Sequence, residues 1–274
     1  MSGILYVTGT PIGNLSDLSP RAAQTLEQVD FIAAEDTRVT LKLLNHLGIK
    51  KPMISYYEHN KRERGEIICA KIEAGENCAI VTDAGMPCIS DPGEDLIKLC
   101  GERGIKTVVI PGPSAVVSAL AVSGLETGRF CFEGFLSVNK KSRNEHLQSL
   151  KNERRTMIFY EAPHKLPSTL RDLYSAFGDR KLSIVRELTK IHEEVIRTTT
   201  EYAAENYADG SVKGELVLVL EGAKESETEE NYTLEYAVEL AKKLIENGEK
   251  PTAAAKSAAE MTGFKKNEIY RELL

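Results

Sequence analysis

Three loops rich in glycine and proline follow short apolar runs in the first half of the chain. They cover residues 9–14, 83–93 and 111–114. In open α/β sheets a ligand binds in the crevice at the carboxyl ends of the strands, and glycine and proline there let the backbone itself approach the ligand. Any one of these loops also suits an ordinary turn. Three at the same sheet edge predict a binding site for a ligand of nucleotide size.

The motifs of the commonest nucleotide and metal sites are missing from the sequence. It contains no G-x-G-x-x-G fingerprint, no phosphate loop of the G-x-x-x-x-G-K-[S/T] type and no H-E-x-x-H. These absences weaken NAD and ATP as candidate ligands, and we predict no bound metal.

One dense basic stretch lies at residues 140–155, which hold six basic and two acidic side chains. It includes Lys140, Lys141 and Arg143, the residues that we expect to contact a polyanionic substrate. A surface of this kind can track the phosphates of RNA. A solvated helix face has the same composition, so both interpretations stay open.

The tail carries a second candidate for nucleic-acid binding. Residues 253–274 have the pattern of a helix, a turn that contains glycine and a second helix, as in helix-turn-helix units. Lys265 and Lys266 begin the second helix, where such units contact nucleic acid. Simple packing of the tail is the alternative.

Short apolar runs alternate with amphipathic stretches as far as about Glu221, the pattern of a layered α/β fold. The runs predict strands at residues 4–8, 31–34, 53–57, 78–82, 107–110, 130–136, 156–160, 182–186 and 216–220. Caps and apolar periodicity predict helices at about 20–29, 37–48, 63–73, 94–103, 115–122, 167–177, 233–246, 252–261 and 266–274. The predicted domains are an α/β domain at 1–124, a second α/β domain at 125–223, a linker at 224–232 and a helical domain at 233–274.

Composition sets wider limits on the class of protein. The chain of 274 residues is 42% hydrophobic and 28% charged, which excludes a disordered chain, a collagen and a coiled coil. The net charge of −6 argues at first sight against nucleic acid, but residues 140–155 alone carry +4. Five cysteines without a C-x-x-C pair indicate reduced thiols, and no apolar run reaches the roughly 20 residues of a membrane span. We therefore expect a cytoplasmic protein that makes no membrane contact.

Several motifs in a fixed order resemble the tetrapyrrole methylase family of S-adenosylmethionine-dependent methyltransferases. Within that family they are similar to the branch that methylates the RNA of the small ribosomal subunit. The matching segments are 5–15 (LYVTGTPIGNL), 34–38 (AEDTR), 82–87 (TDAGMP), 89–93 (ISDPG), 111–115 (PGPSA), 159–164 (FYEAPH), 186–190 (RELTK), 193–194 (EE) and 214–217 (GELV). Two departures are Thr8-Gly9, where the branch more often has two apolar or small residues, and Cys88, where it usually has glycine.

The resemblance implies two α/β domains, a homodimer, and S-adenosylmethionine held in the cleft between the domains. It also implies 2′-O-methylation of a cytidine near the decoding centre of 16S ribosomal RNA. The positions that match the donor-binding residues of the family are Thr10, Pro11, Asp83, Ala84, Gly85, Met86, Ile89, Ser114, Ala115, Tyr160, Leu188 and Glu215.

A ribose hydroxyl needs a base or a strong orienting acceptor before it attacks a methyl group. Glu35 and Asp36 end a predicted strand and begin a helix, whose amino terminus stabilises a carboxylate and lowers its basicity, so we expect Asp36 to orient rather than to accept the proton. His59 offers an imidazole suited to proton transfer, and Arg38 and Asn60 beside these groups are expected to bind substrate. A helix cap without chemistry and a structural histidine remain the alternatives.

Two other functions fit parts of the pattern. A methylase of a small tetrapyrrole would share the donor-binding loops. A regulator that senses a ligand would combine an α/β domain with the helix-turn-helix of the tail. The segment 35–38 and the helical tail favour RNA over a tetrapyrrole.

Overall fold

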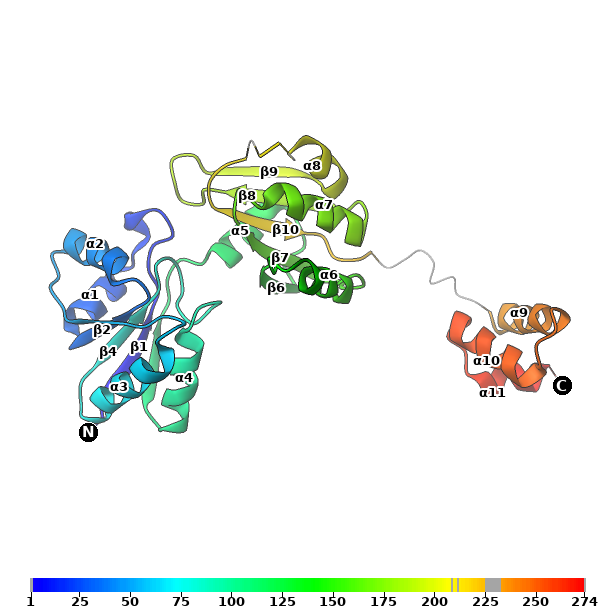
Figure 1. Cartoon of the computed structure of the whole chain (residues 1–274), viewed down its shortest axis with the longest axis horizontal. Coiled ribbons are helices and arrows are strands. Elements are labelled where there is room, and N and C mark those ends of the chain that lie inside the picture. Colours follow the sequence, from blue (N-terminus) through cyan, green and yellow to red (C-terminus); the bar gives the residue numbers. More distant parts are fainter. Residues whose placement is uncertain (1, 208, 211, 225–232, 274) are drawn as a thin grey trace. The chain divides into compact units, whose positions relative to one another are not determined.

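The computed structural model describes residues 2–207, 209–210, 212–224 and 233–273 (Figure 1). Two compact units emerge, residues 1–222 and residues 223–274. Within the described residues, the first contains two sheets and the second contains three helices.

The first sheet is parallel throughout and has the strand order β3-β2-β4-β1-β5. Its strands are β1 (Ile4–Thr8), β2 (Phe31–Ala34), β3 (Met53–Ser55), β4 (Cys78–Val81) and β5 (Lys106–Ile110). Every residue of β2 and β4 is buried, as expected for strands that helices cover on both faces. The connecting helices are α1 (Pro20–Gln28), α2 (Thr37–Leu47), α3 (Lys61–Glu73) and α4 (Gly93–Glu102), with a short 3-10 turn η1 at Leu15–Asp17.

Local sequence signals begin and end these helices. The Ser19 hydroxyl accepts a hydrogen bond from the backbone N–H of Ala22, and Pro20 occupies the first turn of α1. Asp36 caps α2 in the same way through the N–H of Arg38. Gly48 ends α2 with a φ of 71°, a left-handed conformation that glycine adopts without steric cost. Cap residues therefore place Asp36 at the carboxyl end of β2.

The second sheet is mixed and has the order β6-β7-β10-β8-β9. Its strands are β6 (Phe130–Phe135), β7 (Thr156–Glu161), β8 (Lys181–Arg186), β9 (Glu194–Thr199) and β10 (Leu216–Leu220). β10 runs antiparallel between β7 and β8, and all five of its residues are buried. The helices of this half are α5 (Ala115–Ser123), α6 (Lys140–Ser149), α7 (Leu166–Phe177) and α8 (Thr200–Asn206).

Helix α5 packs on the second sheet, although it follows the last strand of the first. Val116, Ala119 and Leu120 form one apolar cluster with Val185 and Val217 of the second sheet. The other face of that sheet is covered by a larger cluster that includes side chains of α6, α7 and α8. The chain thus passes from one sheet to the other through α5. The predicted domain boundary at 124/125 falls directly after this helix and stays a prediction.

The second unit consists of α9 (Leu234–Glu246), α10 (Pro251–Thr262) and α11 (Lys266–Glu272). Their buried residues are mostly small, with Ala237, Ala241, Ala255 and Ala258 packed around Ile269. Most of the predicted linker 224–232 lies outside the described residues. None of the helices described here is both long and apolar enough to cross a membrane.

The α/β class and the helical tail were predicted, and the structure confirms both. Four elements were not predicted: η1, α6, β9 and α8. In α6 only Leu147 is buried, so the sequence carries no apolar period there. β9 lies at the edge of its sheet with no fully buried residue, and α8 has seven residues.

Candidate functional site

The three loops rich in glycine and proline meet at the carboxyl edge of the first sheet. A Cβ on Gly9 would lie 2.7 Å from the Cα of Gly112 and 2.7 Å from the Sδ of Met86. Thr10 and Gly85 exchange two backbone hydrogen bonds, of 2.9 and 3.2 Å. Only glycine fits at Gly9, because a side chain there would enter the backbone of the neighbouring loop. The loops therefore form one continuous cradle of backbone groups.

The remaining donor positions of the first half lie around this cradle. The Thr10 hydroxyl donates to the carbonyl of Thr82 over 3.1 Å. Ala84 and Ile89 are exposed, and Ile89 leaves 54% of its surface free. Ser114 precedes α5 without a side-chain capping bond, and Ala115 begins that helix.

Residues of the second sheet complete the surroundings of the cradle. A Cβ on Gly13 would lie 2.9 Å from the Oγ1 of Thr189 and 2.7 Å from the Cγ of Lys190, so the loop after β1 touches the loop after β8. Leu188 packs in the cluster of α5. Tyr160 is half-buried, its ring lies 4.9 Å from that of Phe132, and burial raises the pKa of its hydroxyl.

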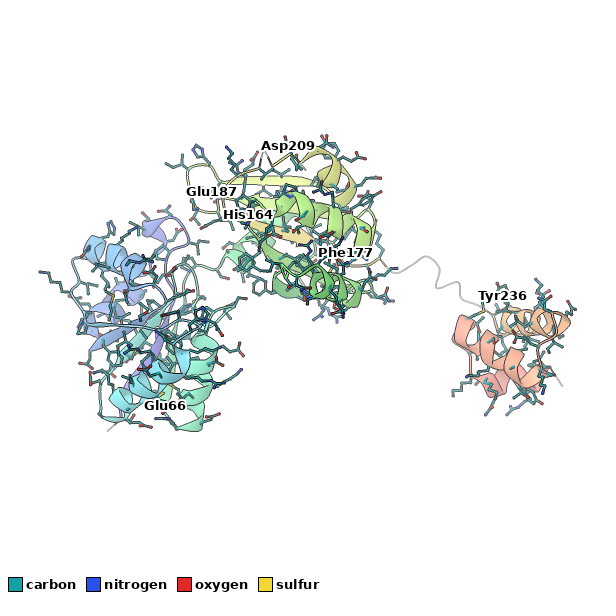
Figure 2. The ribbon with its side chains drawn as sticks, viewed as in Figure 1. Glu66, His164, Phe177, Glu187, Asp209 and Tyr236 are labelled. Atoms are coloured by element: carbon teal, nitrogen blue, oxygen red, sulfur yellow. The ribbon has the colours of Figure 1, made fainter. Side chains whose placement is uncertain are left out.

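An ion-pair network braces the loop after β8. The Nζ of Lys190 lies 2.9 Å from Glu187 Oε1 and 3.1 Å from Glu215 Oε2. Glu187 Oε1 also accepts from the backbone N–H of Glu215 over 2.9 Å, and these two contacts lower the pKa of Glu187. Figure 2 shows Glu187 on the second sheet at this loop. Sequence reasoning missed Lys190 as a site residue, although it is the last residue of the RELTK motif.

Three carboxylates gather where β2 and β4 end side by side. Glu35 Oε2 accepts a hydrogen bond of 2.5 Å from the Thr82 hydroxyl, and Asp83 Oδ1 accepts one of 3.1 Å from the backbone N–H of Asp36. The Arg38 guanidinium beside Asp36 lowers the pKa of that carboxyl to about 2. Desolvation, with the charges of Glu35 and Asp36, raises the pKa of Asp83. The pKa values of the two aspartates are therefore shifted in opposite directions: Asp36 stays ionised, and Asp83 holds a proton more readily.

His59 and Asn60 have different surroundings from those of the carboxylates. His59 is exposed, and its ring packs edge-on against that of Tyr57, with the two ring centroids 6.1 Å apart. The Asn60 side chain accepts from the N–H of Tyr57 and donates to the carbonyl of Ser55. The amide of Asn60 is thus engaged in holding the turn after β3.

Two cavities open at this edge of the first sheet. The acidic cavity, of about 480 Å³, is lined by Glu35, Glu58, Lys61, Ser90, Asp91, Pro92, Glu94, Asp95 and Lys98. The loop cavity, of about 210 Å³, is lined by Thr10, Pro11, Gly13, Leu15, Val39, Thr40, Lys42, Leu43, Thr82 and Asp83. The sequence did not single out Lys42, since its place on the cavity wall depends on how α2 packs beside the loop after β1.

The cradle fits a cationic sulfonium donor such as S-adenosylmethionine. The loops at 9–14, 83–93 and 111–114 contain no lysine or arginine, whereas Asp83 and Asp91 lie within them. Carbonyl oxygens and carboxylates attract a cation. The chemistry of the residues present is therefore that expected of a binding site for this donor.

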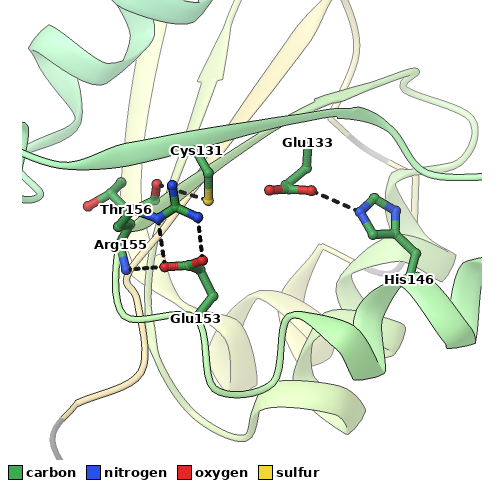
Figure 3. Close-up of polar contacts among 6 residues, drawn as sticks. All are labelled: Cys131, Glu133, His146, Glu153, Arg155 and Thr156. Carbon is green, nitrogen blue, oxygen red and sulfur yellow. Dashed lines mark hydrogen bonds and ion pairs between the residues drawn. The ribbon is translucent and has the colours of Figure 1, made fainter.

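The basic stretch at 140–155 is less open than its sequence suggests. The guanidinium of Arg143 pairs with Asp172 at 2.8 Å and leaves only 15% of the side chain exposed. Arg155 pairs with Glu153 at 2.6 Å, and Figure 3 shows this pair beside Cys131, with the His146–Glu133 pair further along. Lys140 and Lys141 remain exposed on α6. In the tail, Lys265 and Lys266 are likewise exposed at the start of α11.

Known proteins share both the sequence and the fold. The family model for Tetrapyrrole (Corrin/Porphyrin) Methylases matches residues 4–204. A protein of Synechocystis sp. named ribosomal RNA small subunit methyltransferase I is 46% identical over 270 residues, 98% of this chain and 96% of its own. The protein of the same name from Thermotoga maritima is 47% identical over 220 residues, 80% of this chain and 99% of its own.

Among solved structures, the uroporphyrin-III C-methyltransferase of Thermus thermophilus complexed with S-adenyl homocysteine superposes with a TM-score of 0.57. It is 16% identical in sequence and covers 80% of this chain and 97% of its own. At that identity the likeness concerns the fold. The chain belongs to the tetrapyrrole methylase family, in the branch of the ribosomal RNA small subunit methyltransferase I proteins.

Proposed function

We propose that the protein transfers a methyl group from S-adenosylmethionine to the ribose 2′-hydroxyl of a cytidine in 16S ribosomal RNA of the small subunit. The observation that carries this proposal is the 46% identity, over nearly the whole chain, to a relative named for methylation of small-subunit ribosomal RNA. The ribose oxygen and the cytidine come from the family resemblance. We place the reaction in the cytoplasm, where bacterial ribosomes are assembled.

In this proposal the donor lies in the cradle, held by the backbone of Thr10, Pro11, Gly85 and Ser114. S-adenosylmethionine supplies an activated methyl group on a sulfonium. The chain supplies position, because a methyl transfer needs the attacking oxygen in line with the bond that breaks. The remaining donor contacts come from Ala84, Met86, Ile89, Ala115, Tyr160, Leu188 and Glu215.

RNA would dock on the cations that remain exposed. Lys140 and Lys141 on α6 and Lys265 and Lys266 on α11 are open to solvent. Arg38 has 88% of its side chain exposed while it pairs with Asp36, so its outer face can still meet a phosphate. Arg143 would first have to leave Asp172. Binding through such contacts weakens as salt rises, because each phosphate contact releases counterions.

A homodimer is the proposed assembly, with β5, α5 and β6 at its interface. Large apolar side chains are exposed on these elements, namely Val109, Val117, Val122, Phe130 and Phe135, and Val138, in the segment after β6, is 76% exposed. Exposed apolar side chains in this number favour contact with another protein surface. Val117→Glu should give a monomer in analytical ultracentrifugation. Tyr202→Glu on α8 is the matched control, and an unchanged dimer in Val117→Glu would contradict the interface.

The test of the function is methyl transfer to small ribosomal subunits from cells that lack this protein. Labelled S-adenosylmethionine and the full chain should modify one nucleotide, which nuclease digestion and mass spectrometry locate. A methyl on a cytidine 2′-oxygen is expected. Transfer to a base, or none to 16S RNA, would overturn the proposal. Transfer to uroporphyrinogen instead would favour the tetrapyrrole alternative, which is supported by the similarity of the fold.

A further inference from the structure

The loop cavity lies beside the cradle and shares residues with it. Thr10 and Pro11 line it from the loop after β1, and α2 contributes Val39 and Lys42 to the lining. Thr82 and Asp83 also line it. A ligand group in this cavity would therefore lie against the loop that ends β1 and the loop that ends β4, the two loops joined by the Thr10–Gly85 bridge.

The cavity has one charge of each sign on its lining. Asp83 and Lys42 are the only ionisable residues among those that line it. Asp83 uses Oδ1 to accept from the N–H of Asp36, and no hydrogen bond reaches Oδ2 from the described part of the chain. Within the same described part, Lys42 is exposed and forms neither an ion pair nor a hydrogen bond. A free acceptor and a free cation thus share one small cavity.

The acidic cavity differs in charge. Five carboxylates line it against two lysines, and both lysines are already paired: Lys61 lies 2.7 Å from Asp95, and Lys98 lies 2.6 Å from Glu94. A phosphodiester brought there would meet an excess of negative charge. A ribose linked to its phosphates is better accommodated by the loop cavity, where an unpaired ammonium group is available.

We propose that the loop cavity receives the target ribose of the RNA, with Lys42 against its phosphate and Asp83 Oδ2 accepting the proton of the attacking hydroxyl. This assignment deepens the proposed function and rests on it. It gives Asp83 a different role from the donor contact that the family resemblance implies.

The proton balance of the step is simple. The O–H bond of the ribose hydroxyl breaks, its proton passes to Oδ2 of the Asp83 carboxylate, and the freed electron pair of the oxygen forms the new O–C bond. The carboxylic acid then returns the proton to water. S-adenosylmethionine supplies the methyl group and keeps the electron pair of the broken C–S bond on sulfur.

The surroundings of the two aspartates favour Asp83 over Asp36 as the acceptor. Asp36 is held by Arg38 with both oxygens engaged, which lowers its pKa to about 2 and makes it a poor base. The charged groups around Asp83 are the carboxylates of Glu35 and Asp36, the guanidinium of Arg38, and Lys42 on the lining of the same cavity. Desolvation by burial, together with the two carboxylates, raises the pKa of Asp83, which is the direction that a general base requires.

Steady-state kinetics on the full chain test both residues, with small subunits from cells that lack this protein as substrate. Asp83→Asn keeps the Oδ1 acceptor for Asp36, and we expect kcat to fall by about 10²- to 10⁴-fold, the usual contribution of a general base. Lys42→Gln should raise KM for subunits, leave kcat within about threefold, and reduce the salt slope of binding by about 1. Glu102→Gln and Lys50→Gln, both on exposed residues outside the cavities, are the matched controls.

Calorimetry of donor binding separates the possible roles of Asp83. The dissociation constant for S-adenosylmethionine should stay within about threefold of wild type in Asp83→Asn. A loss of donor affinity that matches the loss of activity would make Asp83 a donor contact and overturn the assignment. So would activity near wild type in Asp83→Asn, or a Lys42→Gln variant that behaves like Lys50→Gln.

The pKa of Asp83 itself can be measured without substrate, by NMR titration of the ¹³C chemical shift of its carboxyl group in the wild-type protein. It should titrate above the ordinary value for aspartate, and Glu35→Gln should bring it down. A pKa at or below the ordinary value would remove the acceptor role. If wild-type protein methylates no small-subunit RNA, the proposed function fails with the assignment, whereas an active wild type with an active Asp83→Asn overturns the assignment alone.

Discussion

The guanidinium of Arg38 holds both carboxylate oxygens of Asp36, with Nη2 2.6 Å from Oδ2 and Nε 3.0 Å from Oδ1. Asp36 Oδ1 also accepts from the N–H of Arg38 at the start of α2. One aspartate therefore caps a helix, fixes an exposed arginine and, through its own N–H, holds Asp83 in place. A carboxylate in this position organises its neighbours and stays ionised.

Asp36→Ala should abolish methyl transfer while donor binding persists. The change removes the cap of α2 and releases Arg38, but leaves the three loops of the cradle intact. Transfer to small subunits and calorimetry of donor binding measure the two effects, with Glu102→Ala on α4 as control. An Asp36→Ala protein that methylates at the wild-type rate would contradict the orienting role.

Gly9→Ala should lose at least about tenfold in donor affinity, because the new Cβ would lie 2.7 Å from backbone and sulfur atoms of two other loops. Gly101→Ala is the matched control: nothing lies within 4 Å of its Cβ, and it should stabilise α4 by about 0.5–1 kcal/mol. Calorimetry and urea unfolding measure the pair. Equal donor affinity in both variants would show that the cradle tolerates a side chain.

Thr169→Val should destabilise the second sheet by about 1–3 kcal/mol. Glu161 is buried, with 5% of its surface exposed, and accepts hydrogen bonds from the hydroxyl of Thr169 and, at 2.8 Å, from the N–H of Ala162. Valine keeps the shape of threonine and removes one donor from a buried carboxyl. Urea unfolding of Thr169→Val beside Thr198→Val, on the edge strand β9, measures the difference. Equal midpoints would mean that Glu161 finds another donor.

The Glu153–Arg155 pair should stabilise the protein less as the medium becomes acidic. Its side-chain bond to Arg155 lowers the pKa of Glu153 to about 2, from 4.5 for an ordinary glutamate. A lowered folded-state pKa contributes stability above pH 4.5 that is lost as the pH falls towards 2. Glu153→Gln should cost under about 1 kcal/mol at pH 6, because 42% of the Arg155 side chain is exposed and solvent screens the pair, and less at pH 3. A difference in unfolding free energy that does not change with pH would exclude this contribution.

A chain that stops after Lys224 should keep its chemistry and bind RNA less tightly. The Thermotoga maritima relative aligns over 220 residues that make up 99% of its length. That relative is therefore about as long as the first unit of this chain. We expect kcat within about threefold of the full chain and a higher KM for small subunits. A full-length chain with Lys265→Ala and Lys266→Ala should show the same rise in KM, and a tenfold fall in kcat on truncation would contradict the accessory role.

Much of the fold could be predicted from the sequence, because its strongest elements are short runs of apolar residues. Ile4–Thr8, Phe31–Ala34 and Leu216–Leu220 are strands with the predicted bounds. Ser19 and Gly48 mark helix ends by cap chemistry that needs no tertiary context. By contrast, α6 is polar on almost every side, so its helical state depends on Asn139 at its start and on Leu147 reaching the core.

The candidate site was predictable in its backbone and less so in its side chains. Loops rich in glycine and proline after parallel strands must share one edge, and they do. The ion pair of Arg38 with Asp36 depends on side-chain rotamers. The ion pair of Arg143 with Asp172 also depends on how elements distant in the sequence pack together. Lys42 lines the loop cavity because α2 packs beside the loop after β1, which the sequence alone does not indicate.

The central place of β10 has a consequence for synthesis of the chain. The first sheet has all its strands once residue 110 has been synthesised, so its strands can pair while the ribosome is still translating the rest of the chain. The second sheet must wait for residues 216–220, because β7 and β8 are joined only through β10. Until then both carry unpaired backbone edges, which are prone to aggregation. A nascent chain stalled before Leu216 should therefore recruit chaperones to its second half alone.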